Sequence, residues 1–338
     1  MRKVGIRMVP TFFSLISDSG TYSDIYCDIC NRNMEKFEVT ILGCGSATPS
    51  TKHYTSSQIV NIREKLFMVD CGDGTQIQIR RSRQAFAKIS HILISHLHGD
   101  HCFGLLGIIS TFGLLGRTAP LYIHAPLEMW DILGKELDIY CKDMGFEVIF
   151  QGFDPSQIRT IYEDRSLSIE TIPLRHRVPC AGFLFREKTT SDHLNRKMCD
   201  YYNVPVWDYG RIKDGGDFTL PDGSVIPHSR LTTPADPVRS YAYCCDTAYN
   251  PDMVEQIRGA NLIYHDCTYS NADEDRAVLH HHSTAGQAAR TAAAAGAGRL
   301  MLGHFSARYD DETVLLNEAC QVFSDSILAR EGLTVSLS

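Results

Sequence analysis

The chain of 338 residues has no apolar run long enough to cross a membrane. The stretch at residues 11–17 is too short and too polar for the hydrophobic part of a secretion signal. Basic residues are not in excess, since 33 Lys and Arg stand against 40 Asp and Glu, for a formal net charge of −7. Phosphate-binding proteins usually carry a basic excess, so an RNA substrate would require local rather than global charge complementarity.

The 12 cysteines lack the dense spacing of a small secreted protein held by disulfides. Several fall in or beside expected strands, where a buried thiol behaves as a small apolar group: Cys180, Cys244 and Cys245. Cys27 and Cys30 form a single Cys-x-x-Cys pair without the second pair that a zinc finger needs. We therefore expect a cytoplasmic protein in a reducing environment.

One short segment is rich in metal-binding side chains. His96-Leu97-His98-Gly99-Asp100-His101 follows the apolar run 91–95, which predicts a loop at the end of a buried strand. Imidazole nitrogens and carboxylate oxygens are ligands that Zn²⁺ accepts readily. His96 and His98 can point to one position while Asp100 and His101 point to a second, so the loop predicts two metal ions.

Two metal ions need further ligands, and isolated candidates stand at the ends of other expected strands. His176 follows the alternating run 167–174, Asp246 follows 241–245, and His304 follows 299–302. Taken singly, each is more often an ordinary core or surface residue. Beside a metal-binding loop, the three become candidate ligands.

The chain alternates short apolar strands with helices and shows no internal repeat. We expect strands near 37–43, 57–62, 66–70, 91–94, 121–124, 167–174, 181–187, 241–245, 261–265 and 299–302, and helices near 74–84, 104–114, 127–143, 284–294 and 311–322. This order predicts an α/β fold with two sheets between helical layers. The fold would occupy residues 37–338 as one domain, preceded by an N-terminal tail, 1–36, with no assigned role and with Met34 as a natural initiator.

From about Met34 to near its C-terminus, the sequence resembles the metallo-β-lactamase superfamily and, within it, the short form of ribonuclease Z, the endonuclease that trims precursor tRNA 3′ ends. The metal-binding loop alone indicates only the superfamily. The narrower resemblance rests on a set of motifs in order: Leu42-Gly43-Cys44-Gly45-Ser46-Ala47-Thr48-Pro49 with Ser56-Ser57, Val69-Asp70-Cys71-Gly72-Asp73-Gly74-Thr75-Gln76, Pro173-Leu174-Arg175-His176-Arg177-Val178-Pro179, Asp246-Thr247, His282-Ser283-Thr284-Ala285 and Gly303-His304-Phe305-Ser306-Ala307-Arg308-Tyr309. The resemblance implies a four-layer αββα sandwich.

The resemblance also implies how the ligands divide between two Zn²⁺ ions. One ion would be held by His96, His98 and His176, the other by Asp100, His101 and His304, with Asp246 bridging them. The same donors accept Mn²⁺ or Fe²⁺. Two cations about 3.5–4 Å apart can clamp a phosphodiester and lower the pKa of a shared water. Asp100 is then the candidate general base.

A leaving 3′ oxygen needs a proton, and His282 is the candidate donor with Asp266 as its orienting carboxylate. The family usually has Glu at the position of Asp266. Because Asp is one methylene shorter, we expect the pairing to be looser or bridged by water. The alternative is that His282, which follows His280 and His281, is only an exposed loop residue before a helix.

Substrate choice is expected to depend on a segment near 189–226, where the family has a protruding arm that grips tRNA. Arg196 and Lys197 are candidate RNA contacts there, and Arg308 of the last motif is another. The segment lacks the Gly-Pro-rich signature of the family arm and has Val204-Pro205-Val206-Trp207-Asp208-Tyr209-Gly210 instead. Its aromatic residues would stack on RNA or pack within the loop. Outside the arm, Arg80, Arg81 and Arg83 cluster on one expected helix.

The sequence thus favours a zinc-dependent phosphodiesterase that processes precursor tRNA. A small-molecule or other nucleic-acid phosphodiesterase with the same dinuclear site is the first alternative. A metal-binding or RNA-binding protein without turnover is the second, although binding alone would not need an open dinuclear centre with a proton donor. The resemblance also implies a homodimer.

Overall fold

The computed structural model describes residues 7–8, 35–47 and 50–337. The predicted initiator Met34 and the Cys27–Cys30 pair lie outside these residues. The described residues divide into two compact units, a larger one (those up to 162, with 169–185 and 239–337) and a smaller one (163–168 and 186–238).

The first sheet runs through the larger unit in the order β1-β7-β6-β5-β4-β3-β2-β19. Its strands are β1 (Arg7–Met8), β2 (Phe37–Gly43), β3 (Ser57–Ile62), β4 (Lys65–Cys71), β5 (Ile89–Leu93), β6 (Leu121–Pro126), β7 (Val148–Phe153) and β19 (Thr334–Ser336). Strands β4 to β7 are parallel neighbours. Since β1 pairs with β7, residues 7–8 of the predicted tail lie in the sheet.

The second sheet has the order β18-β17-β16-β15-β10-β9-β8. It consists of β8 (Thr160–Glu163), β9 (Leu167–Pro173), β10 (Ala181–Glu187), β15 (Ser240–Cys244), β16 (Leu262–Asp266), β17 (Arg299–Gly303) and β18 (Ser326–Leu328). The two sheets face each other through buried side chains. The rings of Phe67 on β4 and Phe185 on β10 lie 5.9 Å apart, and Tyr243 on β15 donates a hydrogen bond to Asp70 on β4.

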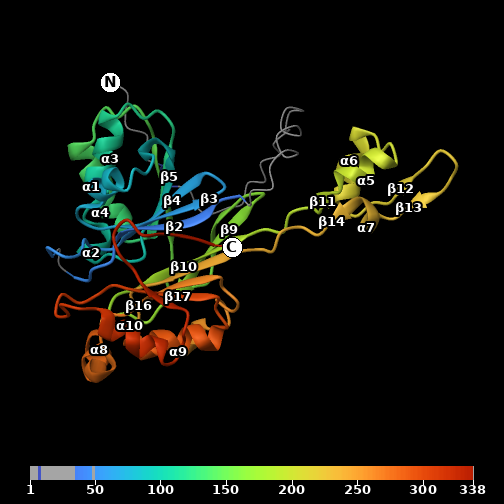
Figure 1. The fold of residues 1–338 in the computed structure, drawn as a ribbon. Helices are drawn as coiled ribbons and strands as arrows, with labels where there is room; N and C mark the ends of the chain where they lie inside the picture. The colour runs from blue at the N-terminus through green and yellow to red at the C-terminus, as the bar shows by residue number, and fades with distance from the viewer. Residues whose placement is uncertain (1–6, 9–34, 48–49, 338) are drawn as a thin grey trace. The chain divides into compact units, whose positions relative to one another are not determined.

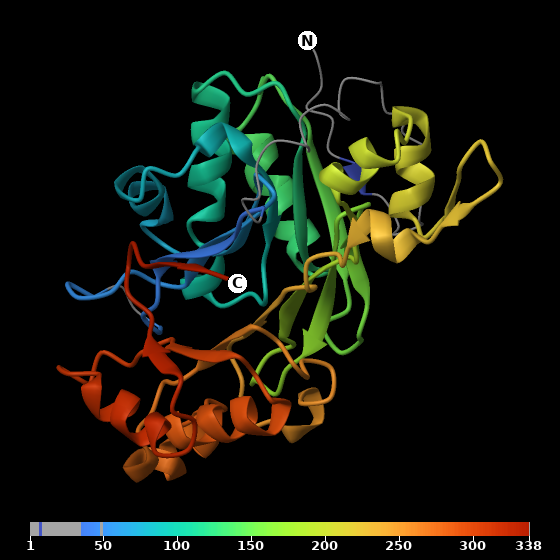
Figure 2. The same ribbon diagram turned by 45° about the vertical axis from the view of Figure 1, so that its right-hand side comes forward.

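Helices cover the outer faces of both sheets, as Figure 1 shows for α1, α3 and α4 on the first sheet and α9 and α10 on the second. Figure 2 gives the same arrangement from another side. The helices of this unit are α1 (Thr75–Arg81), α2 (Gly99–Cys102), α3 (Leu105–Leu114), α4 (Met129–Tyr140), α8 (Glu274–His280), α9 (Ala285–Ala295) and α10 (Thr313–Cys320), with 3₁₀ turns at Phe86–Lys88, Pro251–Met253 and Asn271–Asp273. The predicted four-layer αββα sandwich is confirmed.

Helix α9 shows how the sequence sets one of these layers. The Thr284 hydroxyl accepts a hydrogen bond from the Gln287 backbone N–H, and the Gln287 side-chain oxygen accepts one from the Thr284 backbone N–H, which is a capping box. The alanines that follow this cap along the helix are strong helix formers. Ala288, Ala289 and Ala292 are fully buried, so their small side chains let the helix lie close to the sheet.

The predicted basic cluster on α1 is only partly correct. The helix ends at Arg81, and Arg83 lies beyond it with a φ of 53°. Arg81 donates a hydrogen bond to the Tyr54 hydroxyl, and Arg80 lies 5.4 Å above the Phe86 ring. The three arginines therefore do not form one basic surface on the helix, because the guanidinium groups of Arg80 and Arg81 lie against different aromatic rings.

The smaller unit has its own core, formed by buried residues that include Cys199, Ile212 and Leu231. Its elements are β11 (His193–Leu194), α5 (Arg196–Tyr201), a 3₁₀ turn at Val206–Asp208, α6 (Tyr209–Lys213), β12 (Phe218–Thr219), β13 (Val225–Ile226), α7 (His228–Leu231) and β14 (Thr232–Thr233). The unit extends beyond the predicted segment 189–226 at both ends. Among all described residues, no helix is long and apolar enough to cross a membrane.

Candidate metal centre

The candidate ligands lie where strands of the two sheets end. Strand β5 ends at Leu93 and leads into the loop that holds His96 and His98, while α2 carries Asp100 and His101. In the second sheet β15, β16 and β17 are parallel neighbours, so their carboxyl ends share one edge. Asp246 and His304 follow β15 and β17 at this edge, and His176 follows β9.

One group consists of His96, His98, His176 and Asp246, whose donor atoms lie within 4.8 Å of one another. His98 Nδ1 lies 3.0 Å from His96 Nε2 and 3.2 Å from His176 Nε2. Asp246 Oδ2 lies 3.7 Å from His96 Nε2 and 3.8 Å from His176 Nε2. Four donor atoms therefore converge on one point.

The second group consists of Asp100, His101, His304 and the same Asp246. Here Asp246 uses its other oxygen, Oδ1, which lies 3.3 Å from His101 Nε2 and 3.1 Å from His304 Nε2. Asp100 Oδ2 lies 3.5 Å from His101 Nε2 and 3.4 Å from His304 Nε2. The two oxygens of Asp246 thus face two different groups, which is the geometry of a bridging ligand.

Hydrogen bonds on the far side of the rings fix their orientation. His101 Nδ1 lies 2.7 Å from Asp70 Oδ2, and His304 Nδ1 lies 2.9 Å from Thr268 Oγ1. His176 Nδ1 lies 3.0 Å from a backbone carbonyl, and His96 Nδ1 lies 2.9 Å from the Ser95 hydroxyl. If each Nδ1 carries the proton in these bonds, each Nε2 presents a lone pair to the centre.

This donor set fits a cation. Lone pairs of imidazoles and carboxylates that converge without a positive charge repel one another. A tetrahedral Zn²⁺ with bonds of about 2.0–2.1 Å places its ligand atoms about 3.3 Å apart. The separations of 3.0–3.8 Å within the two groups lie around that value.

The electrostatics of the centre also favour positive charge. Burial, followed by the neighbouring His101, holds the pKa of His96 well below its usual value, so this imidazole is neutral. Burial would also lower the pKa of His101, but the surrounding carboxylates, Asp246 first, raise it well above its usual value. Buried carboxylates therefore attract a proton to the place where a metal ion would supply the charge.

His282 lies beside the two groups and is held by Asp266. The Asp266 carboxylate is fully buried at the end of β16 and lies 2.7 Å from His282 Nδ1. The expectation of a looser or water-bridged pairing is wrong. Backbone N–H groups of Thr247 and Thr268 hold the short Asp266 side chain in reach of the imidazole.

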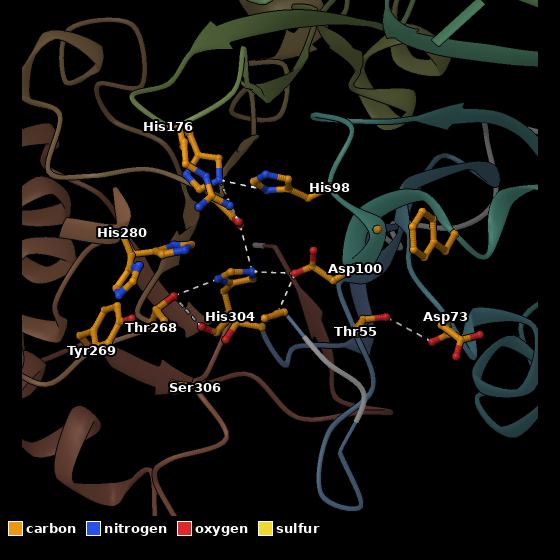
Figure 3. Close-up of a pocket in the computed structure, with 17 residues that line it drawn as sticks. Thr55, Asp73, His98, Asp100, His176, Thr268, Tyr269, His280, His304 and Ser306 are labelled. Carbon is orange, nitrogen blue, oxygen red and sulfur yellow. Dashed lines mark hydrogen bonds and ion pairs between the residues drawn. The ribbon is translucent and has the colours of Figure 1, made fainter. Parts of the chain in front are cut away.

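A cavity of about 760 Å³ opens over the centre. Figure 3 shows Asp100 and Thr55 on one side of His304, and Tyr269 and His280 on the other. The lining of the cavity also includes His282, Arg177 and Phe103. The cavity is wide enough for a substrate larger than a phosphate group.

The predicted substrate contacts are distributed over both units. The Arg308 guanidinium lies 5.1 Å from the centre of the Tyr269 ring, which lines the cavity. Arg196 and Lys197 are exposed on α5 of the smaller unit, where Arg196 forms an ion pair of 3.0 Å with Asp200.

Sequence reasoning missed residues that support the ligands. Asp70 and Thr268 bind His101 and His304, but no role was predicted for either of them. Ala47 donates its backbone N–H to Asp100 Oδ2 at 2.8 Å, which explains why the opening glycine motif lies near the centre. Asp70 belongs to the motif that begins at Val69, and Thr268 lies two residues after Asp266, which was the available signal.

Comparisons with known proteins agree with this geometry. A family model described as "Beta-lactamase superfamily domain" matches residues 230–305, and one described as "Anti-Pycsar protein Apyc1" matches residues 37–198. The crystal structure of the short form of human tRNase Z superimposes with a TM-score of 0.66 at 24% identity, covering 89% of this chain and 99% of that chain. Fold and site together define a protein with the metallo-β-lactamase fold and candidate metal-binding groups at the ends of its strands.

Curated relatives narrow this assignment. The ribonuclease Z of Phocaeicola vulgatus is 55% identical over 304 residues, which cover 90% of this chain and 98% of that protein. The ribonuclease Z of Bacteroides thetaiotaomicron is 54% identical over 305 residues, with 90% and 96% covered. The chain belongs to the ribonuclease Z family.

Proposed function

We propose that this protein is a metal-dependent endoribonuclease that removes 3′ trailers from precursor tRNA. The observation that carries the proposal is the carboxylate of Asp246, whose two oxygens face two ligand groups in one cavity beside the imidazole of His282. The relatives that share half of its residues over nearly their whole length are ribonucleases Z.

The centre would hold two Zn²⁺ ions per chain, one in each ligand group, and Mn²⁺ or Fe²⁺ would fit the same donors. When bound, two such ions polarise a phosphodiester and lower the pKa of the attacking water. Among the protein residues, Asp246 would balance charge at both positions. Asp70 and Thr268 would keep His101 and His304 oriented toward the metal.

His282 is suited to protonate the leaving 3′ oxygen. Burial acts to lower the pKa of His282, but the charge of Asp266 at 2.7 Å outweighs burial, so the pKa is raised to about 9. The bond to Asp266 thus favours the protonated form of the imidazole. Because Nδ1 is bound to Asp266, Nε2 is left to donate toward the cavity that His282 lines.

Asp100 would serve as both ligand and general base. Burial raises its pKa, but the imidazoles of His101 and His304 lower it far more, so the carboxylate stays charged. Ala47 N–H and the second ligand group hold Oδ2. Oδ1 is then the oxygen that accepts a proton from the attacking water.

The smaller unit would act as the arm that grips tRNA away from the cut. Its exposed cations Arg196 and Lys197 and the 85% exposed Trp207 offer phosphate contacts and a stacking surface. Tyr209 does not contribute, because it is buried in the core of the unit. Close to the centre, Arg308 would contact the RNA backbone beside Tyr269.

A homodimer is part of the proposal. Ile132 and Ile139, seven residues apart on one face of α4, are exposed together with Tyr140. A second copy that covered these side chains would remove their apolar surface from water. We also propose a reducing cytoplasm as the place of action, because the cysteines of the described residues are free thiols.

Cleavage of a precursor tRNA with a 3′ trailer, beside a small chromogenic phosphodiester, tests this function. We expect one cut directly after the discriminator base, leaving a 3′ hydroxyl on the tRNA. The variant Asp246→Ala is the control and should cleave neither substrate. Turnover of the small diester alone would support a small-molecule phosphodiesterase. If the wild-type protein turned over neither substrate, this would support a binding protein without catalytic activity.

A further inference from the structure

An aromatic ring stands exposed in the wall of the cavity. Phe103 is 78% exposed and lines the cavity three residues after Asp100. Single exposed apolar side chains are common on protein surfaces, so exposure alone assigns no role. Burying a phenylalanine side chain is worth about 1.5–3 kcal/mol, which a substrate base that covered this ring would recover in part.

The ring is also held in place. A Cβ atom at Gly99 would lie 2.3–2.7 Å from three atoms of the Phe103 ring, so glycine at this position lets the ring rest on the backbone of the metal-binding loop. The Phe103 N–H donates to the Gly99 carbonyl at 3.0 Å, and Gly104 N–H donates to the Cys71 carbonyl at 2.8 Å. A ring supported on one side and exposed elsewhere is a preformed stacking surface.

The position of the ring indicates which nucleotide it meets. Asp100 and Thr55 lie on one side of His304, and Tyr269 lies on the other (Figure 3). A Cβ at Gly72 would lie 2.4 Å from the Asp100 carbonyl and 2.2 Å from Thr55 Oγ1, which places α2 on the side of Thr55. His282 contacts the rings of Tyr269 and His304 on the other side.

If His282 protonates the leaving 3′ oxygen, the nucleotide that keeps this oxygen lies on the side of Tyr269. The nucleotide that keeps the phosphate, the first one of the trailer, then extends toward α2. We propose that Phe103 stacks on the base of this first trailer nucleotide and thereby positions the scissile phosphate. The inference rests on the proposed function, because it requires a single-stranded RNA trailer.

The test combines removal of the ring with removal of the base. Phe103→Ala should lower kcat/KM for precursor tRNA by roughly 5- to 150-fold, which corresponds to about 1–3 kcal/mol per stacked base. Phe103→Tyr, which keeps the ring, should retain the activity of the wild-type enzyme. Leu114→Ala, which removes another exposed apolar side chain of the same unit, is the matched control and should also be unaffected.

The second arm uses a precursor whose first trailer nucleotide is abasic. On this substrate the wild-type enzyme and Phe103→Ala should have the same kcat/KM, because no base is left to stack. Both should also hydrolyse methyl p-nitrophenyl phosphate, which has no base, at equal rates. An equal loss by Phe103→Ala on the normal and the abasic precursor would overturn the proposal.

Two further outcomes separate this inference from the function beneath it. If the loss disappears only when the discriminator nucleotide is abasic, the ring stacks on the other side of the cut and the assignment is wrong. If wild-type enzyme cleaves precursor tRNA and Phe103→Ala equals it, the stacking role fails while the nuclease function stands. Failure of the wild-type enzyme on precursor tRNA would refute the function itself.

Discussion

Asp70 offers a direct test of how the centre is supported from outside the ligand set. This buried carboxylate accepts hydrogen bonds from His101 Nδ1 and the Tyr243 hydroxyl at 2.7 Å, and from Ser95 N and Oγ at 2.8 and 2.9 Å. Oδ2 takes three of these bonds and Oδ1 takes one. The variant Asp70→Asn keeps the size of the side chain and replaces one acceptor by a donor.

The expected loss of stability follows from the number of hydrogen bonds that each oxygen of Asp70 accepts. The amide introduced by Asp70→Asn would place its oxygen where Oδ2 accepts three bonds, and its NH₂ would then face the Ser95 N–H. One buried donor without an acceptor costs about 1–3 kcal/mol of stability. His101 would also lose the charged partner that fixes its orientation, and such a loss lowers metal affinity roughly 10- to 100-fold.

Zinc competition with a chromogenic chelator and thermal unfolding of the metal-free protein measure the two effects separately. Tyr243→Phe is the control, because it removes one donor to Asp70 and leaves the bond to His101 intact. It should lower stability without changing zinc affinity. Wild-type zinc affinity in folded Asp70→Asn would refute the reasoning.

Four further predictions concern catalysis, substrate binding and pH. Asp100→Ala should abolish cleavage and lower the zinc content measured by mass spectrometry, and full activity with two metals would contradict its double role. His282→Ala should retain zinc but slow cleavage of precursor tRNA about 10²- to 10⁴-fold, and an unchanged rate would remove it from the mechanism. A short Gly-Ser linker can replace residues 194–235, because the flanking side chains of His193 and Asp236 meet, with Nε2 and Oδ1 3.3 Å apart. This variant should lose cleavage of precursor tRNA but keep hydrolysis of a small diester. An equal loss on both substrates would indicate a structural role. Burial lowers the pKa of His53, but its bonds to Glu331 and a second carboxylate raise this pKa above the usual 6.5. The pairing therefore stabilises the fold fully below pH 6.5, and this stabilisation is lost as the pH rises through the pKa of the folded protein. The unfolding free energies of wild-type protein and His53→Gln should thus differ by about 1–2 kcal/mol at pH 6 and by less at pH 9, and a difference that grows with pH would contradict this sign.

The sequence was informative where a strand is buried on both faces and leads directly into polar residues. Ile92, Leu93 and Ile94 before His96 are apolar and fully buried, so the end of this strand and the metal-binding loop were visible in the sequence. Strand β7 was missed, since Gln151 and Gly152 interrupt its apolar pattern. The smaller unit reaches Val238, beyond the predicted segment, and β14 near that end is two residues long and carries no periodicity.

Contacts between distant segments could not be read from local patterns. Asp70 reaches His101 only because β4 and β5 are parallel neighbours, with Met68 beside Ile92. The direct bond between Asp266 and His282 depends on the backbone groups that hold the carboxylate, not on the length of its side chain. Residue types and order predicted which side chains gather, and the pairing of the strands decides how they are held.

The central claim is that Asp246 joins two metal positions that act together on precursor tRNA. Zinc added stepwise to the chelator-treated protein, with cleavage of precursor tRNA followed at each step, tests it directly. Activity should reach its plateau at two Zn²⁺ per chain. A plateau at one equivalent, or cleavage in the presence of excess chelator, would contradict the claim.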